Sequence, residues 1–280
     1  MKASNAQVMT KVFEHAKAVD EMCEKNGGKR ILTVLFGSQN YDLDTDQSDV
    51  DTKSIVAPDV ENWLWNEVHY DNINMSDGSH AEIKNVTAMF KQFIKGNINF
   101  LELLYSPYVD IAPGWEWFYE ELIAQRDNIS RHNMYKQGHT WISYCQQMRE
   151  RTTHCSQFAE LKDGEHVDSM GYDYNLHYNP KALMNALRLK ESCIRFFEFQ
   201  QPFDEAIDMG DMRETLLKVK MGNLDRETVN NICNDLDVWI VRFDSYITNH
   251  YTDHEVFDAI GYLKKLAVKT FSAMLVSGKE

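Results

Sequence analysis

Residues 31–51 read ILTVLFGSQNYDLDTDQSDVD, and our prediction of the fold depends mainly on this stretch. Residues 31–36 are apolar or β-branched and predict a buried strand that ends at Gly37-Ser38. A polar loop follows, and Asp49 and Asp51 then open a second strand-like stretch that runs to about residue 57. Because side chains two apart on a strand point the same way, we expect the two carboxylates on one face.

These two aspartates and the glycine-serine turn suit one kind of chemistry. Carboxylate oxygens are good ligands for Mg²⁺, which usually brings phosphate oxygens with it. The turn offers backbone N–H groups and a hydroxyl to a triphosphate. Metal-assisted phosphoryl or nucleotidyl transfer is the simplest reaction that uses both halves. The alternative is a solvated strand start after an acidic loop, because an Asp-x-Asp pattern alone is common.

The pattern resembles the metal and triphosphate motif of the DNA polymerase beta superfamily of nucleotidyltransferases. The fuller set is similar to a bacterial and phage branch called predicted nucleotidyltransferases, and comprises Gly37, Ser38, Tyr41, Thr45, Ser48, Asp49 and Asp51. Residues 95–104, which read KGNINFLELL, are similar to the same branch, as are residues 181–189 and 213–222. The resemblance therefore extends over most of the chain. Relatives usually carry glycine after the motif tyrosine, where this chain has Asp42.

The resemblance implies a role for each motif residue. Asp49 and Asp51 would bind Mg²⁺ or Mn²⁺, and Gly37 and Ser38 would hold the β- and γ-phosphates of a nucleoside triphosphate. The superfamily also uses a third carboxylate on a neighbouring strand, which binds the catalytic metal. Glu82 is the best-placed candidate for that role.

Several of these assignments have open alternatives. The alternative for Glu82 is a surface residue at a strand edge or helix start, and Asp71 and Asp77 are weaker candidates for the third carboxylate. Lys53 shares the expected face of Asp51 and would either contact a phosphate or neutralise the aspartates. Lys181 and Arg188, seven apart on an expected helix, would reach the triphosphate or form surface or interdomain pairs. Asn97, Asn99 and Glu102 belong to the similar segment, where the asparagines would cap the chain or contact a nucleotide.

Composition narrows the class of protein. The 280 residues are 43% hydrophobic and 26% charged, which is an ordinary globular balance. No apolar run is long enough to span a bilayer, and the first residues lack a signal-peptide core. The five scattered cysteines predict reduced thiols in a cytoplasmic protein. The net charge of −14 argues against broad, nonspecific nucleic-acid binding.

The chain is expected to be an α+β protein with two parts. Residues 1–110 would form a small mixed nucleotidyltransferase sheet with helices, and residues 111–280 a C-terminal helical bundle. Ser4 and Gln7 predict a capping box at the start of a first helix, and Gly27-Gly28 predict its end. Helical spacing of apolar residues returns after residue 85 and holds almost to residue 280.

The resulting functional prediction is a metal-dependent nucleotidyltransferase. It would move a nucleoside monophosphate from a triphosphate to an acceptor hydroxyl and release pyrophosphate. An RNA 3′ end, a protein and a small metabolite all remain possible acceptors, and the sequence does not give the oligomeric state. The competing class is an inactive nucleotide-binding sensor or protein-interaction module. Asp42 in place of glycine favours this class, whereas the presence of Asp49, Asp51 and Glu82 favours the enzyme.

Overall fold

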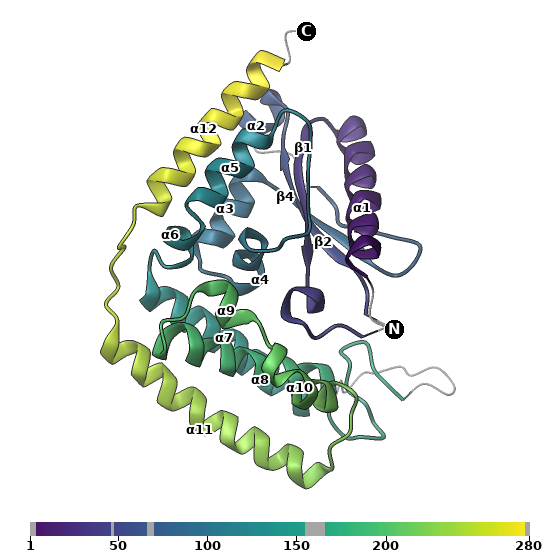
Figure 1. Ribbon diagram of the computed structural model, residues 1–280, viewed down its shortest axis with the longest axis vertical. Coiled ribbons are helices and arrows are strands. Elements are labelled where there is room, and N and C mark those ends of the chain that lie inside the picture. Colours follow the sequence, from purple (N-terminus) through teal and green to yellow (C-terminus); the bar gives the residue numbers. More distant parts are fainter. Residues whose placement is uncertain (1–3, 46–47, 66–69, 155–165, 278–280) are drawn as a thin grey trace. The chain divides into compact units, whose positions relative to one another are not determined.

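The structure is a computed structural model that describes residues 4–45, 48–65, 70–154 and 166–277. The chain divides into two compact units, of which the first comprises Met1–His132 with Glu255–Glu280 and the second comprises Asn133–His254. The first unit holds a mixed sheet with helices and the second is helical (Figure 1). The predicted α+β class is therefore confirmed. No helix within the described ranges is long and apolar enough to cross a membrane.

A five-stranded sheet forms the centre of the first unit. Its strands are β1 (Lys29–Phe36), β2 (Asp51–Ala57), β3 (Ile73–Asn74), β4 (His80–Asn85) and β5 (Val109–Ile111). Their order in the sheet is β3-β4-β2-β1-β5. The β1–β2, β1–β5 and β3–β4 pairs are antiparallel, whereas β2 and β4 run parallel. The strand-loop-strand arrangement predicted from residues 31–57 is thus present, with β1 and β2 as central neighbours.

Helices cover both faces of this sheet. The helices and 3-10 turns of the first unit are α1 (Asn5–Asn26), η1 (Ser38–Tyr41), α2 (Val60–Trp65), α3 (Val86–Ile94), α4 (Ile98–Leu101), η2 (Glu102–Leu104), α5 (Glu116–Ala124), α6 (Arg126–Ser130) and α12 (Ala259–Ser277). Helix α1 lies on one face, and α3, α5 and α12 lie on the other side (Figure 1). The predicted capping box of α1 is confirmed: Ser4 Oγ accepts from the backbone of Gln7, whose side chain accepts from Ser4 N–H. The helix ends, as predicted, before Gly27 (φ 80°).

The domain boundary differs from the sequence-based one. We expected all of residues 111–280 in a helical domain, but α5, α6 and the C-terminal helix α12 belong to the first unit. Aromatic contacts explain this difference. Phe271 of α12 meets the edge of Trp63 with ring centroids 5.5 Å apart, and Phe118 of α5 stacks on Phe90 of α3 at 6.0 Å. Their partners lie far away in the sequence, so local helical periodicity does not reveal them.

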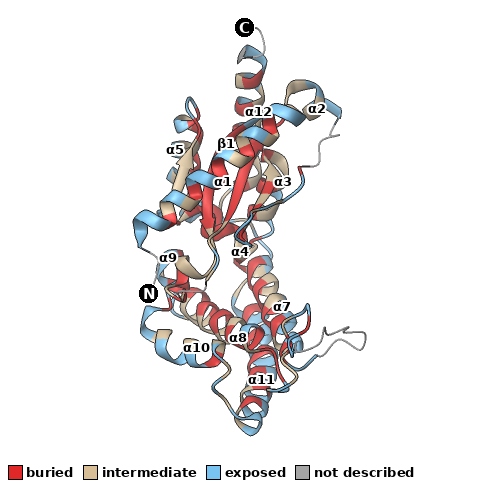
Figure 2. Cartoon of the chain, turned by 90° about the vertical axis from the view of Figure 1, so that its right-hand side faces the viewer, coloured by how far each residue is buried: buried red, intermediate tan, exposed pale blue. Residues whose placement is uncertain are grey.

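The second unit is a bundle of helices around an aromatic core. Its elements are α7 (Met134–Thr153), α8 (Pro180–Cys193), a π-helical turn η3 (Ile194–Glu198), α9 (Phe203–Ile207), η4 (Gly210–Met212), α10 (Arg213–Lys220) and α11 (Arg226–His250). Trp141 of α7 stacks on Phe196 at 5.1 Å, and Trp239 of α11 stacks on Phe243 at 4.8 Å. All four side chains are buried, and they come from α7, η3 and α11. Figure 2 shows buried residues along α7, α8 and α11.

Candidate functional site

The predicted phosphate turn lies where β1 ends. Gly37 has φ 109° and ψ −150°, a conformation that is open to glycine but not to residues with a Cβ. A Cβ at this position would meet no atom within 4 Å, so the requirement for glycine is conformational rather than steric. The turn then folds back on itself, because Asn40 N–H donates to Gly37 O at 3.0 Å and Asn40 Nδ2 donates to Leu35 O at 3.1 Å.

Asp42 stands at the one departure from the motif, and its backbone explains the preference for glycine there. Its φ of 58° and ψ of 31° are left-handed, which costs most residues energy but is tolerated by aspartate and asparagine. The chain therefore retains the left-handed turn without glycine. The departure adds a negative charge to the loop while leaving its backbone path in place.

The two motif aspartates do not both lie in the strand. Asp51 is the first residue of β2, whereas Asp49 lies in the preceding loop and is exposed. The expectation that Asp49 would open the strand is therefore wrong. The loop is held by the side chain of Gln39, whose Nε2 donates to Asp49 O at 2.8 Å. Residues 46 and 47 of this loop fall outside the described ranges.

The parallel pairing of β2 with β4 brings Glu82 to the face that Asp51 occupies. Lys53 lies directly opposite Glu82 in this register. Residues opposite one another share a face of a sheet, and Asp51 shares the face of Lys53 because the two are two apart. Glu82 therefore lies on the neighbouring strand and on the same face as Asp51, which is the position that the resemblance implies for a third carboxylate.

Both oxygens of the Glu82 carboxylate already have cationic partners. Oε2 pairs with the ammonium group of Lys53, and Oε1 pairs with Lys84 Nζ at 2.9 Å. The Lys53 side chain is only 4% exposed, and its Nζ lies 3.8 Å from the ring centroid of Phe36 and 4.5 Å from that of Phe100. Lys53 thus neutralises Glu82, rather than the aspartates that we had considered as its partners.

The pKa values of this pair reflect burial and charge together. Burial lowers the pKa of the Lys53 ammonium group from its ordinary value of 10.5, and the Glu82 carboxylate only partly opposes this. Burial alone would raise the pKa of Glu82, but the two lysines outweigh it and the net pKa lies below 4.5. Glu82 is therefore a carboxylate at neutral pH.

Two histidines that we did not predict hold the strand ends that carry these groups. His80, the first residue of β4, lies beside Asp51, with its Nδ1 2.8 Å from Asp51 Oδ1. His15 of α1 is fully buried on the opposite face and bonds to Thr52 and Ser79. Both left a signal in the sequence. His80 precedes Glu82 by two and so shares its face, and His15 interrupts the apolar stripe of α1.

The other predicted residues have varied positions. Asn97 caps α4, since its side chain accepts from Asn99 N–H at 3.1 Å. Glu102 is fully buried and accepts a hydrogen bond from the hydroxyl of Tyr41, which links the motif loop to η2. Lys181 and Arg188 both lie on α8 in the second unit, where Lys181 is exposed and Arg188 is buried.

The two weaker candidates for the third carboxylate lie outside β4. Asp77 accepts from Ser79 Oγ at 2.5 Å and pairs with Lys11 Nζ of α1 at 2.9 Å. These bonds hold the pKa of Asp77 well below its usual range. Asp71 lies before β3 and is exposed. Asp77 is thus engaged on the α1 side, and the register favours Glu82 because it shares the face of Asp51.

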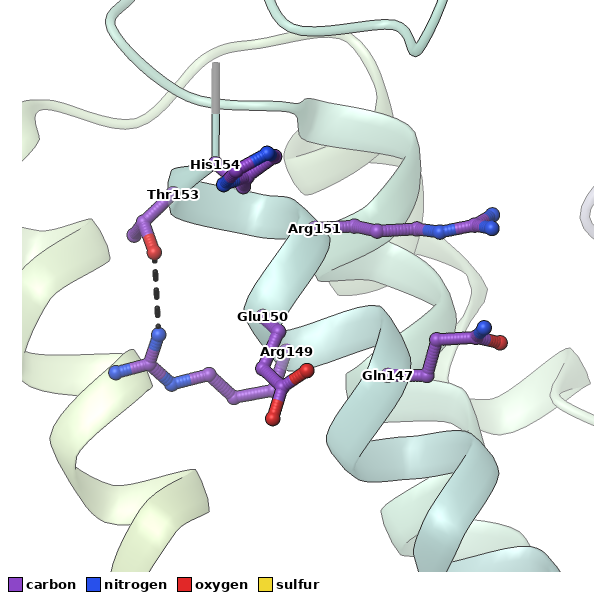
Figure 3. A pocket seen from close by; sticks show the side chains of 6 residues that line it. All are labelled: Gln147, Arg149, Glu150, Arg151, Thr153 and His154. Carbon is purple, nitrogen blue, oxygen red and sulfur yellow. Dashed lines mark hydrogen bonds between the residues drawn. The ribbon is translucent and has the colours of Figure 1, made fainter. Parts of the chain in front are cut away.

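A surface pocket of about 550 Å³ lies elsewhere, at the C-terminal end of α7 in the second unit. Its lining residues are Gln147, Arg149, Glu150, Arg151, Thr153 and His154 (Figure 3). Arg149 points toward Thr153 and donates to its hydroxyl at 3.2 Å, and it also pairs with Asp237 at 2.6 Å. Its guanidinium group therefore already makes a hydrogen bond and an ion pair within the second unit. The pocket lining contains none of the predicted site residues.

Compared as a whole sequence, the chain matches no protein-family model and no curated protein. The resemblance to nucleotidyltransferases therefore remains a prediction.

Proposed function

We propose that the chain is a metal-dependent nucleotidyltransferase whose site lies at the start of β2. The observation that supports this most is the parallel β2–β4 register, which puts Glu82 on the face of Asp51, with Asp49 two residues earlier. Such a grouping of carboxylates beside a glycine turn suits a nucleoside triphosphate with its cation. The turn at Gly37 and Ser38 is the proposed contact for the β- and γ-phosphates.

The donor set suits Mg²⁺ or Mn²⁺. Asp51 Oδ1 accepts from His80, while Asp51 Oδ2 has no hydrogen-bond or ion-pair partner among the described residues. Asp49 is exposed. Within those residues, no three acidic, histidine or cysteine side chains are gathered into a ready site. Mg²⁺ is usually held by one or two carboxylates and completed by water and substrate phosphates, so the two aspartates suffice as its protein ligands in this proposal.

In the proposed reaction, the acceptor hydroxyl oxygen forms a bond to the α-phosphorus. The bond from that phosphorus to the bridging oxygen of the β-phosphate breaks, and pyrophosphate leaves. A bound divalent cation supplies charge neutralisation for the attacking and leaving oxygens. Asp49 and Asp51 hold the cation, and Glu82 is the proposed acceptor for the hydroxyl proton. To act so, Glu82 must give up one lysine, and the partly exposed Lys84 is the easier one to release.

The test is transfer of label from each α-labelled nucleoside triphosphate, with Mg²⁺ or Mn²⁺, to pools of RNA, protein and small metabolites. We expect transfer by the wild type and a loss of at least about 100-fold in an Asp49→Asn/Asp51→Asn variant, because these groups stabilise charge in the transition state. Asp235→Asn, which removes an exposed carboxylate from α11, is the matched control and should transfer normally. Equal transfer by the double variant would overturn the proposed site.

One observation favours the alternative of an inactive nucleotide-binding module. Both oxygens of Glu82 are paired with lysines, and such a carboxylate is a poor metal ligand and a poor base. In that case, nucleotides would raise the melting temperature and the aspartate variant would abolish the shift. No label would reach any acceptor pool. This outcome would indicate a nucleotide sensor in place of an enzyme, with the same binding site.

A further inference from the structure

His80 makes two hydrogen bonds to one oxygen of Asp51. Its backbone N–H donates to Asp51 Oδ1 at 3.0 Å, and its ring Nδ1 lies 2.8 Å from the same atom. A carboxylate oxygen only accepts hydrogen bonds at neutral pH, so Nδ1 carries the proton in this contact. Both donors therefore converge on Oδ1 and fix the rotation of the carboxylate, which directs Oδ2 away from them.

A buried chain of hydrogen bonds fixes the same strand ends from the opposite face. Ser79 Oγ donates its proton to Asp77, so it must accept from His15 Nε2–H at 3.0 Å. The remaining nitrogen of the neutral ring, His15 Nδ1, then accepts from Thr52 Oγ1 at 2.8 Å. Burial lowers the pKa of His15, in keeping with a neutral ring. Thr52 follows Asp51, and Ser79 precedes His80, so the chain joins the two peptide segments that carry them.

Resting on the function proposed above, we propose that His80 is a positioning residue that holds Asp51 Oδ1 and presents Oδ2 to the divalent cation. The role belongs to the hydrogen bond from Nδ1 and not to the charge of the ring. Groups that hydrogen-bond a metal ligand typically contribute about 10- to 100-fold to metal affinity or activity. Because the backbone bond to Oδ1 persists in any variant, we expect the lower end, about 10-fold, for the ring contact.

Three substitutions separate the hydrogen bond from the bulk of the ring. His80→Asn places an amide donor where Nδ1 lies, His80→Gln places it nearer the position of Nε2, and His80→Leu removes the donor. His139→Leu is the matched control, because His139 Nδ1 makes the same kind of contact with Asp244 at 2.8 Å in the second unit. Each full-length variant is titrated with Mn²⁺ alone, and bound and free metal are separated by electron paramagnetic resonance. Thermal melts are recorded alongside.

We expect His80→Leu and His80→Gln to weaken Mn²⁺ binding about 10-fold, while His80→Asn and His139→Leu stay close to the wild type. Melting temperatures of the His80 variants should agree within a few degrees. Wild-type affinity in His80→Leu, or equal losses in His80→Asn and His80→Leu, would overturn the positioning role alone. If the wild type bound Mn²⁺ no better than Asp51→Asn, the proposed metal site itself would fall, and the role of His80 with it.

Discussion

The two faces of the sheet at the start of β2 handle buried polarity in opposite ways. On the face toward α1, His15, Thr52 and Ser79 form a chain of neutral hydrogen bonds, and all three residues are buried. On the other face, Lys53 and Glu82 form an ion pair. The same two strands therefore carry a neutral network on one side and a charged cluster on the other.

The two faces therefore differ in the desolvation cost of their buried polar groups. A neutral, satisfied network fixes the strand ends without the cost of desolvating an ion. The charged face bears that cost for Lys53, whose pKa falls through burial, and offsets part of it with Glu82 and two aromatic rings. A bound cation or phosphate would therefore change the electrostatic interactions of the charged face more than those of the neutral face.

The largest effect on stability is expected from breaking the ion pair. Glu82→Gln leaves the ammonium group of Lys53 buried without a counter-charge, which costs about 3–5 kcal/mol in comparable pairs. A Lys53→Met/Glu82→Gln double variant should recover most of this, because methionine packs well against the rings of Phe36 and Phe100. Urea unfolding at neutral pH measures the free energy of unfolding of both variants, which can be compared with the wild type when the dependence of that free energy on urea concentration is unchanged.

The matched control for this cycle is Glu214→Gln on α10, which removes an exposed pair with Lys218 and should leave the urea midpoint unchanged. A loss below about 1 kcal/mol in Glu82→Gln would mean that water reaches Lys53 and that the charged face is not desolvated.

The neutral face should give the next largest effect. His15→Leu leaves the Thr52 hydroxyl without its acceptor and Ser79 Oγ without its donor, which we expect to cost about 2 kcal/mol. Adding Thr52→Val replaces both members of one hydrogen bond by apolar groups and should restore part of the loss. If His15→Leu unfolded at the wild-type urea concentration, the hydrogen-bond chain would contribute nothing to stability.

The two faces should also differ in their response to mild acid. The pKa of His15 lies below its ordinary value of 6.5 because the ring is buried, although Asp77 and Asp51 partly oppose this. The unfolded chain therefore takes up a proton at His15 as the pH falls through about 6.5, while the folded chain does not. The stability due to His15 is fully present above that pH and declines below it, until the lowered pKa is reached.

Urea midpoints of the wild type and His15→Leu at pH 7 and at about pH 5 test this linkage. We expect the stability difference between the two proteins to shrink at the lower pH. Glu82 should not contribute to this change, because its pKa lies below 4.5 and its stabilisation is lost only in stronger acid. A constant or growing difference would contradict a neutral, buried His15.

Local sequence patterns predicted much of the first unit and part of the site. The apolar run before Gly37 predicted β1, the Ser4 capping box and Gly27 predicted the ends of α1, and Asp51, but not Asp49, marked the start of β2. These features depend on propensities and turn chemistry within a few residues. The αL conformation of Asp42 also follows local rules, since aspartate is among the residues that tolerate it.

Long-range contacts explain what the sequence could not give. Lys53 and Glu82 are 29 residues apart, and only the parallel register of β2 and β4 makes them neighbours. His15 bonds to groups 37 and 64 residues away, so the sequence showed only an interruption in an apolar stripe. Helix α12 has a helical pattern that says nothing of its contact with Trp63. Periodicity identifies elements, whereas partners depend on their packing.

The smallest expected effect is a change in Mn²⁺ affinity, which tests whether Glu82 is a metal ligand. Lys84 is partly exposed, and its bond to Glu82 Oε1 is worth about 0.2–1 kcal/mol, as for other surface pairs. If Glu82 ligates the cation, Lys84→Met releases Oε1 and should tighten Mn²⁺ binding by up to about fivefold. Lys25→Met removes an exposed charge from α1 and controls for the general loss of positive charge. An equal gain in both variants, or none in Lys84→Met, would leave Glu82 as the anchor of Lys53 and confine the metal site to Asp49 and Asp51. Because both variants keep Lys53 and Glu82, the comparison separates ligation by Glu82 from its contribution to folding.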